Sequence, residues 1–379
     1  MSGSLNIYRQ INEVHLEVTN CCNLACRYCY VNTKYKQKLN KSDYMNIQLV
    51  KHIIEKVAEK TTVPTLKIVF HGGEPLLLNS EWYEKVFPYI RDICATFRKS
   101  VILSMQTNLT LLNNNMLSLL DKYNVIISTS IDGPELVHNS YKGSFRNTAA
   151  NILKVNKLGL LGGIITVVHF HNYNKVGEII ATLKDLGIKQ FLLNFAYSMG
   201  KGRNLPTLDF EKRFKVYKDL IDYIIKTQGK EIIEHTAFLR IKRFFNSPKK
   251  SELLSNLSCW TPFCHAGIKM LMFKLNGDVY PCGFAGANEY FKLGNIYNNL
   301  REDYIREKLM TFHKKDEKYY RECQYCDART ICFFGCPAAE YEDKMFTEEN
   351  CAFTKVLFNY FLLRRNELEK LLDNEHITI

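Results

Sequence analysis

Residues 14–29, VHLEVTNCCNLACRYC, join a strand pattern to a cluster of cysteines. The β-branched and apolar residues of Val14–Val18 predict a buried strand. Three cysteines follow in the spacing Cys22-x3-Cys26-x2-Cys29. Thiolates are the soft ligands that hold iron–sulfur clusters, and a [4Fe–4S] cube with three protein ligands keeps one iron open. The alternative is a zinc knuckle, for which His15 is the nearest candidate fourth ligand.

The first half of the chain alternates short β-branched runs with helical patterns, as repeated βα units do. The predicted strands are Val14–Val18, Leu66–Phe70, Val101–Gln106, Val125–Ser130, Gly163–His169 and Phe191–Phe195. The predicted helices are Asp43–Glu59, Glu81–Phe97, Asn114–Lys122, Asn147–Lys157 and Lys175–Leu186. Six strands with right-handed crossovers predict an α/β fold, a partial (β/α)6 barrel of the TIM type. From the pattern alone, a doubly wound sheet is the competing architecture.

The composition divides the chain into four predicted parts. They are the barrel (1–206), a helical bridge (207–257), a small cysteine-rich domain (258–355) and a C-terminal helix (356–379). The last part belongs to an amphipathic pattern over Phe353–Asn374, which predicts one helix. The cysteine-rich part has few long periodic segments, so metal clusters would serve to hold it together.

The composition and charge are those of an ordinary globular protein, with 46% hydrophobic residues, 24% charged residues and a net charge of +12. The Lys and Arg residues are spread along the chain, which indicates a solvated surface rather than a nucleic-acid or membrane interface. No apolar run is long enough for a transmembrane helix. The segment Met1–Gln10 lacks the apolar core of a signal peptide, so we expect a cytoplasmic protein.

Thirteen cysteines in a protein of a reducing compartment indicate metal binding or catalysis rather than disulfides. Eight of them lie between Cys259 and Cys351, enough for two fully ligated [4Fe–4S] clusters. Two four-cysteine zinc sites are the alternative, and a zinc-binding nucleic-acid-binding protein is the alternative of another class. Cys21 and Cys94 have no assigned role, and Cys94 is expected to be a core residue of a helix.

The N-terminal motif, with Tyr28 before its last cysteine, resembles the signature of the radical S-adenosylmethionine (SAM) superfamily. Three segments at predicted strand ends extend the resemblance: His71-Gly72-Gly73-Glu74-Pro75, Gln106-Thr107-Asn108 and Ser130-Ile131-Asp132-Gly133-Pro134. The resemblance implies that SAM binds the open iron and yields a 5′-deoxyadenosyl radical that abstracts a substrate hydrogen. It also implies SAM contacts from Tyr28, Gly72, Gly73, Glu74, Asn108, Ser130, Asn194 and Phe195. For Tyr28 and Phe195, core packing is an equally good interpretation.

The C-terminal cysteines resemble the SPASM domain, an extension found in radical SAM enzymes that modify peptides and proteins. The pattern is Cys264-x12-Gly277-x4-Cys282, then Cys323-x2-Cys326-x5-Cys332-x3-Cys336, then Cys351, with Cys259 upstream. The resemblance implies one auxiliary cluster on Cys259, Cys264, Cys282 and Cys336. It implies a second on Cys323, Cys326, Cys332 and Cys351, for three [4Fe–4S] clusters with the one on Cys22, Cys26 and Cys29.

The resemblance is strongest to anaerobic sulfatase-maturing enzymes and to maturases of ribosomally made peptides. In the sulfatase-maturing group an aspartate, the proposed base, follows the cysteine at the Cys282 position, and here Gly283 stands there. Asp278 lies nearby in a predicted tight turn. We therefore expect a peptide maturase that forms an intramolecular carbon–carbon or thioether crosslink. Formylglycine synthesis from Ser or Cys is the alternative, and a radical SAM enzyme acting on a sugar or other small molecule is a further one.

The resemblance also implies the partners of the chain. They are a precursor peptide and an electron donor such as flavodoxin or ferredoxin, with no membrane and no nucleic acid among them. The leader segment of the peptide would be bound by the barrel, by the SPASM region or by a separate leader-binding protein. The sequence names neither the modified residue nor the catalytic residues.

Overall fold

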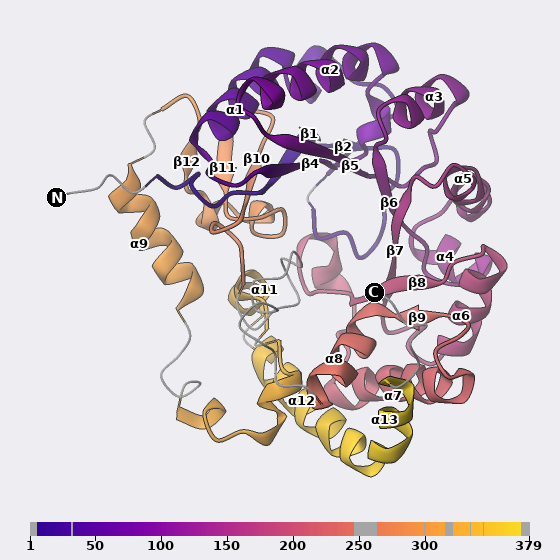
Figure 1. Cartoon of the computed structure of the whole chain (residues 1–379). Coiled ribbons are helices and arrows are strands. Elements are labelled where there is room, and N and C mark those ends of the chain that lie inside the picture. The colour runs from indigo at the N-terminus through magenta and orange to yellow at the C-terminus, as the bar shows by residue number, and fades with distance from the viewer. Residues whose placement is uncertain are drawn as a thin grey trace. The chain divides into compact units, whose positions relative to one another are not determined.

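A computed structural model describes residues 6–372, apart from 32, 246–263, 299–300, 315–320, 334 and 344. Contacts group the chain into two compact units. Unit 1 comprises Met1–Thr129, Asn147–Gly162 and His265–His313, and unit 2 comprises Ser130–Arg146, Gly163–Cys264 and Lys314–Ile379. Figure 1 shows the chain coloured by residue number. The four-part division predicted from composition stays a prediction.

Unit 1 contains a parallel sheet in which neighbouring strands follow each other in the sequence. The strands are β1 (Glu13–Thr19), β4 (Thr65–Gly72), β5 (Ser100–Gln106) and β6 (Ile126–Ser130). Helices α1 (Ile47–Lys60), α2 (Ser80–Thr96), α3 (Asn114–Lys122) and α5 (Phe145–Lys157) connect them or follow them. Figure 1 shows α1 and α2 along one face of β1 and β4. Two short strands, β2 (Cys21–Cys22) and β3 (Lys34–Tyr35), pair beside this sheet.

Sequence analysis did not predict the strands that extend the other edge of this sheet. β10 (Met270–Phe273) pairs with β1 in parallel. β11 (Asp278–Tyr280) then pairs with β10, and β12 (Gly294–Asn295) with β11, both antiparallel. The residues of β10 are all apolar and buried, so this short run has no alternation that would identify it as a strand. Helix α9 (Glu302–His313) follows in the same unit.

The two faces of β1 differ in chemistry because side chains alternate along a strand. Val14, Leu16 and Val18 are fully buried and form part of the apolar core. The opposite face carries Glu13, His15 and Glu17. One face of this strand therefore stabilises the fold, and the other presents titratable groups.

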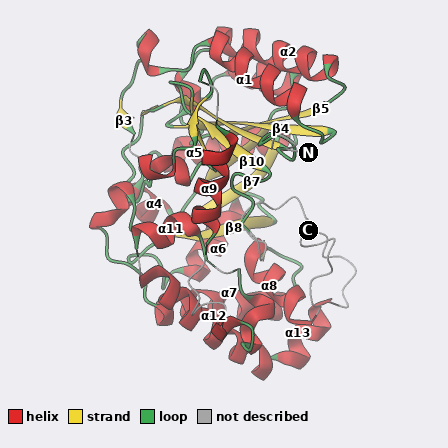
Figure 2. Cartoon of the chain, turned by 90° about the vertical axis from the view of Figure 1, so that its left-hand side faces the viewer, coloured by secondary structure: helices red, strands yellow, loops and turns green. Residues whose placement is uncertain are grey.

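Unit 2 contains the parallel strands β7 (Leu161–Val168), β8 (Gln190–Phe195) and β9 (Ile233–Glu234). Its helices are α4 (Glu135–Tyr141), α6 (Val176–Asp185), α7 (Phe210–Thr227), α8 (His235–Phe245), α11 (Pro337–Glu342), α12 (Met345–Leu363) and α13 (Arg365–Leu372). Helix α12 packs against α7, as Figure 2 also shows. All six predicted strands form. Within each unit, these strands pair in parallel, as the predicted α/β class requires.

Two predicted helices differ from the structure. The first helix begins at Ile47 rather than Asp43, because the Asn46 side chain accepts a hydrogen bond from the Gln48 amide (2.8 Å) and caps it there. The predicted single helix over Phe353–Asn374 is wrong, because two helices, α12 and α13, form its described part, which ends at Leu372. Within the described residues, no helix combines the length and apolarity that crossing a membrane requires.

Candidate functional site

The cysteine motif follows the carboxyl end of β1 and is held there by the segment after β4. The Gly73 amide donates a hydrogen bond to the Thr19 carbonyl (2.8 Å), and the Glu74 amide donates one to the Cys21 carbonyl (2.8 Å). The segment His71–Pro75 therefore braces the backbone just before Cys22. This structural role of the paired glycines was missed by the sequence analysis, which assigned them to SAM alone.

The close approach of these two backbones requires glycine at both positions. Gly72 has φ +123°, and a Cβ there would lie 2.4 Å from the Thr19 carbonyl oxygen. A Cβ on Gly73 would lie 1.9 Å from the Cys21 carbonyl oxygen. A backbone oxygen cannot rotate away as a flexible side chain can, so a larger residue must displace the cysteine motif. Their contact with SAM stays a prediction.

We expect Gly73→Ala to destabilise the chain by about 3 kcal/mol or more and to lower the iron bound per chain, because the new methyl group overlaps the Cys21 carbonyl. Urea unfolding and iron analysis after anaerobic reconstitution measure the two effects. Gly163→Ala in β7 is the matched control, since no described residue other than its chain neighbours has an atom within 4 Å of its Cβ position. Equal iron content and stability in both variants would contradict the bracing role.

Glu74 ties the carboxyl ends of β4 and β5 together. Its side chain is 1% exposed and accepts hydrogen bonds from the Leu76 amide (2.8 Å), the Thr107 hydroxyl (2.5 Å) and the Asn108 amide (2.7 Å). Both carboxylate oxygens are thus engaged within the fold, so the side chain positions the strand ends. Its predicted SAM contact stays a prediction. Thr107, which the sequence analysis named within Gln106-Thr107-Asn108 but gave no role, is part of this arrangement.

Asn108 links β5 to the cysteine motif. Its amide nitrogen donates to the Asn23 side-chain oxygen (3.0 Å) and lies 4.0 Å from the Cys22 sulfur. The Leu24 amide donates to the same sulfur (3.4 Å). Hydrogen bonds to ligand sulfurs orient them and tune the potential of an iron–sulfur cluster. The structure thus gives Asn108 a place beside a candidate ligand, and contact with SAM is a separate prediction.

The chemistry of the three thiols fits an iron–sulfur cluster. Burial, together with the charges of Glu74, Cys26 and Cys29, raises the pKa of the Cys22 thiol to about 12. Such a thiol keeps its proton at neutral pH until a metal displaces it. The charges of Cys26 and Cys29 act on the Cys22 thiol, so these sulfurs lie near it. Tyr28, within the motif, is half-buried.

The other predicted SAM residues lie in unit 2 and have partners of their own. Lys142, which is buried, donates to the Ser130 carbonyl (2.7 Å) and hydroxyl (2.5 Å). Asn194 and Phe195 are half-buried at the carboxyl end of β8. The ring of Phe195 lies 6.0 Å from that of Tyr217, so it contributes to packing. The sequence analysis missed Lys142.

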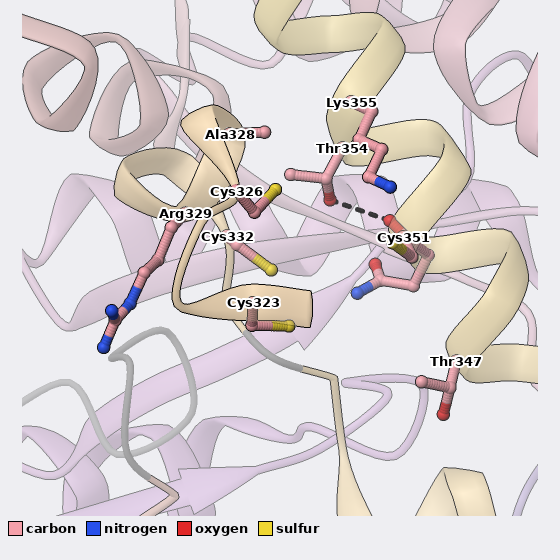
Figure 3. A pocket seen from close by; sticks show the side chains of 10 residues that line it. Cys323, Cys326, Ala328, Arg329, Cys332, Thr347, Cys351, Thr354 and Lys355 are labelled. Carbon is pink, nitrogen blue, oxygen red and sulfur yellow. Dashed lines mark hydrogen bonds between the residues drawn. The ribbon is translucent and has the colours of Figure 1, made fainter. Parts of the chain in front are cut away.

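Four C-terminal cysteines surround one pocket in unit 2. Cys323, Cys326, Cys332 and Cys351 line it, and Figure 3 shows three of the sulfurs directed toward helix α12, which carries Cys351. Burial, and then Cys332, Cys351 and Cys326, raise the pKa of the Cys323 thiol. Lys355 also lines the pocket, and a cation there offsets the negative charge of a cluster bound to four thiolates. This donor set fits the cluster predicted for these cysteines.

Of the remaining C-terminal cysteines, Cys264 and Cys336 lie in unit 2 and Cys282 lies in unit 1. Burial, opposed by amide hydrogen bonds and reinforced by Cys264, raises the pKa of the Cys336 thiol to about 11. In unit 1, the Cys282 sulfur accepts a hydrogen bond from the Ala285 amide (3.3 Å). Cys259 lies outside the described residues. Within the described ranges, no three His, Cys, Asp or Glu side chains group to hold one metal ion.

Asp278 does not supply the base that is missing at position 283. It is 6% exposed and is bound by Asn276, Asn295 and Lys292, which lie 2.8–2.9 Å from its oxygens. These partners fold the turn between β10 and β11. Two imidazoles lie next to Gly283. A Cβ on this residue would lie 3.3 Å from His15 Nδ1 and 3.8 Å from His71 Cε1.

Comparisons with known proteins agree with this arrangement. The family model described as "Radical SAM superfamily" matches residues 16–186, and that of an "Iron-sulfur cluster-binding domain" (SPASM) matches residues 264–327. The radical SAM cyclopropyl synthase TigE of Paramaledivibacter caminithermalis is 34% identical over 95% of this chain and 75% of its own. A serine-type anaerobic sulfatase-maturating enzyme of Bacteroides thetaiotaomicron is 28% identical over 83% of this chain and 80% of its own.

A solved structure supports the fold. The native sulfatase-maturing enzyme anSMEcpe with bound AdoMet and Cp18Cys peptide covers 96% of this chain and 99% of its own at a TM-score of 0.78 and 19% identity. At this identity the likeness concerns the fold alone. Taken with the two family models and the 34% identical relative, it confirms the α/β core and the cysteine-rich C-terminal domain. The chain therefore belongs to the radical SAM superfamily, as an enzyme that carries a SPASM iron–sulfur domain.

Proposed function

We propose that this radical SAM enzyme is a peptide maturase that closes an intramolecular crosslink in a ribosomally made precursor peptide. The observation that carries the proposal is the 34% identity, over nearly the whole chain, to a relative named a cyclopropyl synthase. Closing a cyclopropyl ring makes a carbon–carbon bond within one molecule. Gly283, in place of an aspartate, supports a reaction other than formylglycine synthesis.

The proposal includes three [4Fe–4S] clusters on the cysteine sets inferred above. Bound SAM and its cluster supply an organic radical that removes a hydrogen atom, and the auxiliary clusters supply a place for the electron released. The segment around Gly73 braces the first cysteine motif, and Glu74 and Asn108 join it to the ends of β4 and β5. Ser130, Asn194 and Phe195 are proposed to contact SAM from unit 2.

The proposed partners are the precursor peptide, an electron donor of the flavodoxin or ferredoxin type, and a separate protein that binds the leader segment. Solved relatives support a peptide substrate, since one is titled with a bound Cp18Cys peptide and SuiB with its precursor peptide SuiA. A net charge of +12 supports an acidic leader. Precursor affinity that does not change with salt would contradict this attraction.

Formylglycine synthesis is the second candidate, favoured by the 28% identical sulfatase-maturating relative. Crosslinking and oxidation of Ser both remove two hydrogens, so mass alone does not separate them. A formylglycine aldehyde reacts with a hydrazide probe, and a crosslinked peptide does not. Fragmentation in tandem mass spectrometry is also suppressed between crosslinked residues.

The test is anaerobic reconstitution with iron, sulfide, SAM and dithionite, followed by reaction with two peptides. One is the short peptide encoded beside the gene, and the other is a sulfatase peptide containing Ser or Cys. We expect loss of two hydrogens and no hydrazide adduct with the first peptide, and no change in the second. A hydrazide-reactive product would favour the sulfatase-maturing function, and unchanged mass with deuterium uptake from D2O would identify an epimerase.

A further inference from the structure

Glu13 and His15 form a hydrogen-bonded pair on the polar face of β1. His15 Nε2 lies 2.5 Å from Glu13 Oε1, and Lys67 Nζ lies 3.5 Å from Glu13 Oε2. Burial raises the pKa of Glu13, but His15 and Lys67 outweigh it and lower that pKa to about 2. An ionised carboxylate only accepts hydrogen bonds, so Nε2 carries the proton and Nδ1 keeps its lone pair.

The other nitrogen of His15 has no partner. Among the described residues, no hydrogen-bonding group reaches His15 Nδ1, although the atom is buried. A buried polar atom without a partner is costly, and native proteins keep few of them outside functional sites. A Cβ on Gly283 would lie 3.3 Å from Nδ1, and among the described residues, its chain neighbours aside, the one other atom within 4 Å would be His71 Cε1. A glycine thus leaves room beside the free lone pair.

His71, on β4, has a different environment from His15. Its ring centre lies 5.9 Å from that of His15, and its Nε2 lies 3.4 Å from the Tyr30 hydroxyl. Burial, and then the proximity of His15, lower the pKa of His71 to about 3. It therefore stays neutral at physiological pH, whereas His15 is hydrogen-bonded to the Glu13 carboxylate. The two neighbouring imidazoles therefore have different environments, which suits them to different roles: His15 as a proton acceptor and His71 as a neutral neighbour.

Other titratable groups also face this pair. They are Glu17 on β1, Lys67 on β4, Lys274 after β10 and Tyr30 beside His71. Burial raises the pKa of Glu17 to about 7 against the charge of Lys274, so Glu17 is the rival proton acceptor. Glu17 lies on the Gly72 side of the strand, where its Cγ is 3.0 Å from the Cβ position of that glycine. Its place is separate from the space beside Gly283.

We propose that the Glu13–His15 pair accepts the proton that leaves the substrate during its oxidation, with Nδ1 as the acceptor. The inference rests on the proposed function. The substrate loses one hydrogen atom from carbon to the deoxyadenosyl radical, one electron to an auxiliary iron–sulfur cluster and one proton to His15, and one new bond forms. Glu13 then stabilises the imidazolium, as carboxylates do in acid–base pairs.

The test compares His15→Gln and Glu13→Gln with Glu17→Gln and with His52→Gln, a histidine on α1 that stacks on Tyr297. The substrate is the peptide encoded beside the gene, and the measured quantity is crosslinked product formed per 5′-deoxyadenosine. We expect His15→Gln to lower this ratio by about a hundredfold or more while deoxyadenosine formation continues. Glu13→Gln should lower it less, and His52→Gln should leave it unchanged.

A second readout separates catalysis from structure. The double variant His15→Gln with Gly283→Asp places a carboxylate in the same space, and we expect it to restore the ratio at least in part. A carboxyl group loses its proton at lower pH than an imidazole does. The pH below which the ratio of product to deoxyadenosine declines should therefore be lower in the double variant. An unchanged ratio in His15→Gln, or loss in Glu17→Gln in its place, would overturn the inference. If the parent enzyme makes deoxyadenosine but no crosslink, the proposed function fails instead.

Discussion

Cys26→Ala is expected to abolish SAM cleavage, by about a thousandfold or more, while the C-terminal clusters remain. Cys26 is the middle cysteine of the motif that follows β1. Cys21, the other cysteine nearby, does not fit the spacing of the motif and so does not replace it. A cube held by two thiolates loses iron readily and no longer presents one defined open iron to SAM. Iron per reconstituted chain should therefore fall by about a third. Anaerobic chromatography of 5′-deoxyadenosine and parallel iron and sulfide analysis measure both effects.

Cys94→Ala is the matched control for this variant. Cys94 is fully buried in α2, and burial raises the pKa of its thiol to about 11, as for a core residue remote from metal chemistry. Its removal should cost some stability but no iron and no SAM cleavage. Cleavage of SAM by Cys26→Ala at the parent rate would refute the ligand role. A colourless parent protein that takes up zinc in place of iron would refute the cluster itself.

The elements that sequence analysis predicted well are those with a local signal. Helix α3 has the predicted bounds, Asn114–Lys122, because Asn113 caps it at the Met116 amide and its apolar residues follow the helical period. The strands β4 and β5 were equally clear from their β-branched residues. The spacing of the cysteines indicated cluster ligands, and the family resemblance divided the C-terminal ones between two clusters; both assignments stay predictions.

The features that sequence analysis missed depend on contacts between distant segments. Pairing of β10 with β1 joins residues more than 250 positions apart, as in Glu13 with Met270 and His15 with Met272. This pairing leads the chain to Gly283, beside His15. Sequence analysis considered His15 only as a zinc ligand, and no local pattern relates it to Glu13 on the same face. The proton-accepting pair was therefore not predictable from either segment alone.

Side chains at the break between α12 and α13 contact a helix that is distant in the sequence. The amphipathic pattern continues through the break. The side chain of Arg364, which lies between the two helices, donates hydrogen bonds to Asp222 on α7 (2.5 Å) and to Glu367 on α13. Tyr360 also binds Asp222. Helical periodicity does not report these contacts with another helix.

Cys332→Ala is expected to abolish product formation while SAM cleavage continues within a few fold of the parent. Cys332 follows the short 3-10 helix Asp327–Ile331 and faces the pocket that it shares with Cys323, Cys326 and Cys351. With one thiolate missing, the proposed cluster is lost or labile, and the path by which we propose that the electron leaves the substrate is interrupted. Iron should fall by about a third, and deoxyadenosine should accumulate without crosslinked peptide.

The control for this variant is Thr347→Ala, which lines the same pocket without offering a sulfur. It should bind as much iron as the parent and form product at a similar rate. Cys332→Ala should also unfold at a lower urea concentration, because a metal cluster that binds only the folded state stabilises this part of the chain. Product formation at the parent rate in Cys332→Ala would mean that this pocket is not on the path of the electron. Full iron content together with product formation at the parent rate would mean that Cys332 is not a ligand.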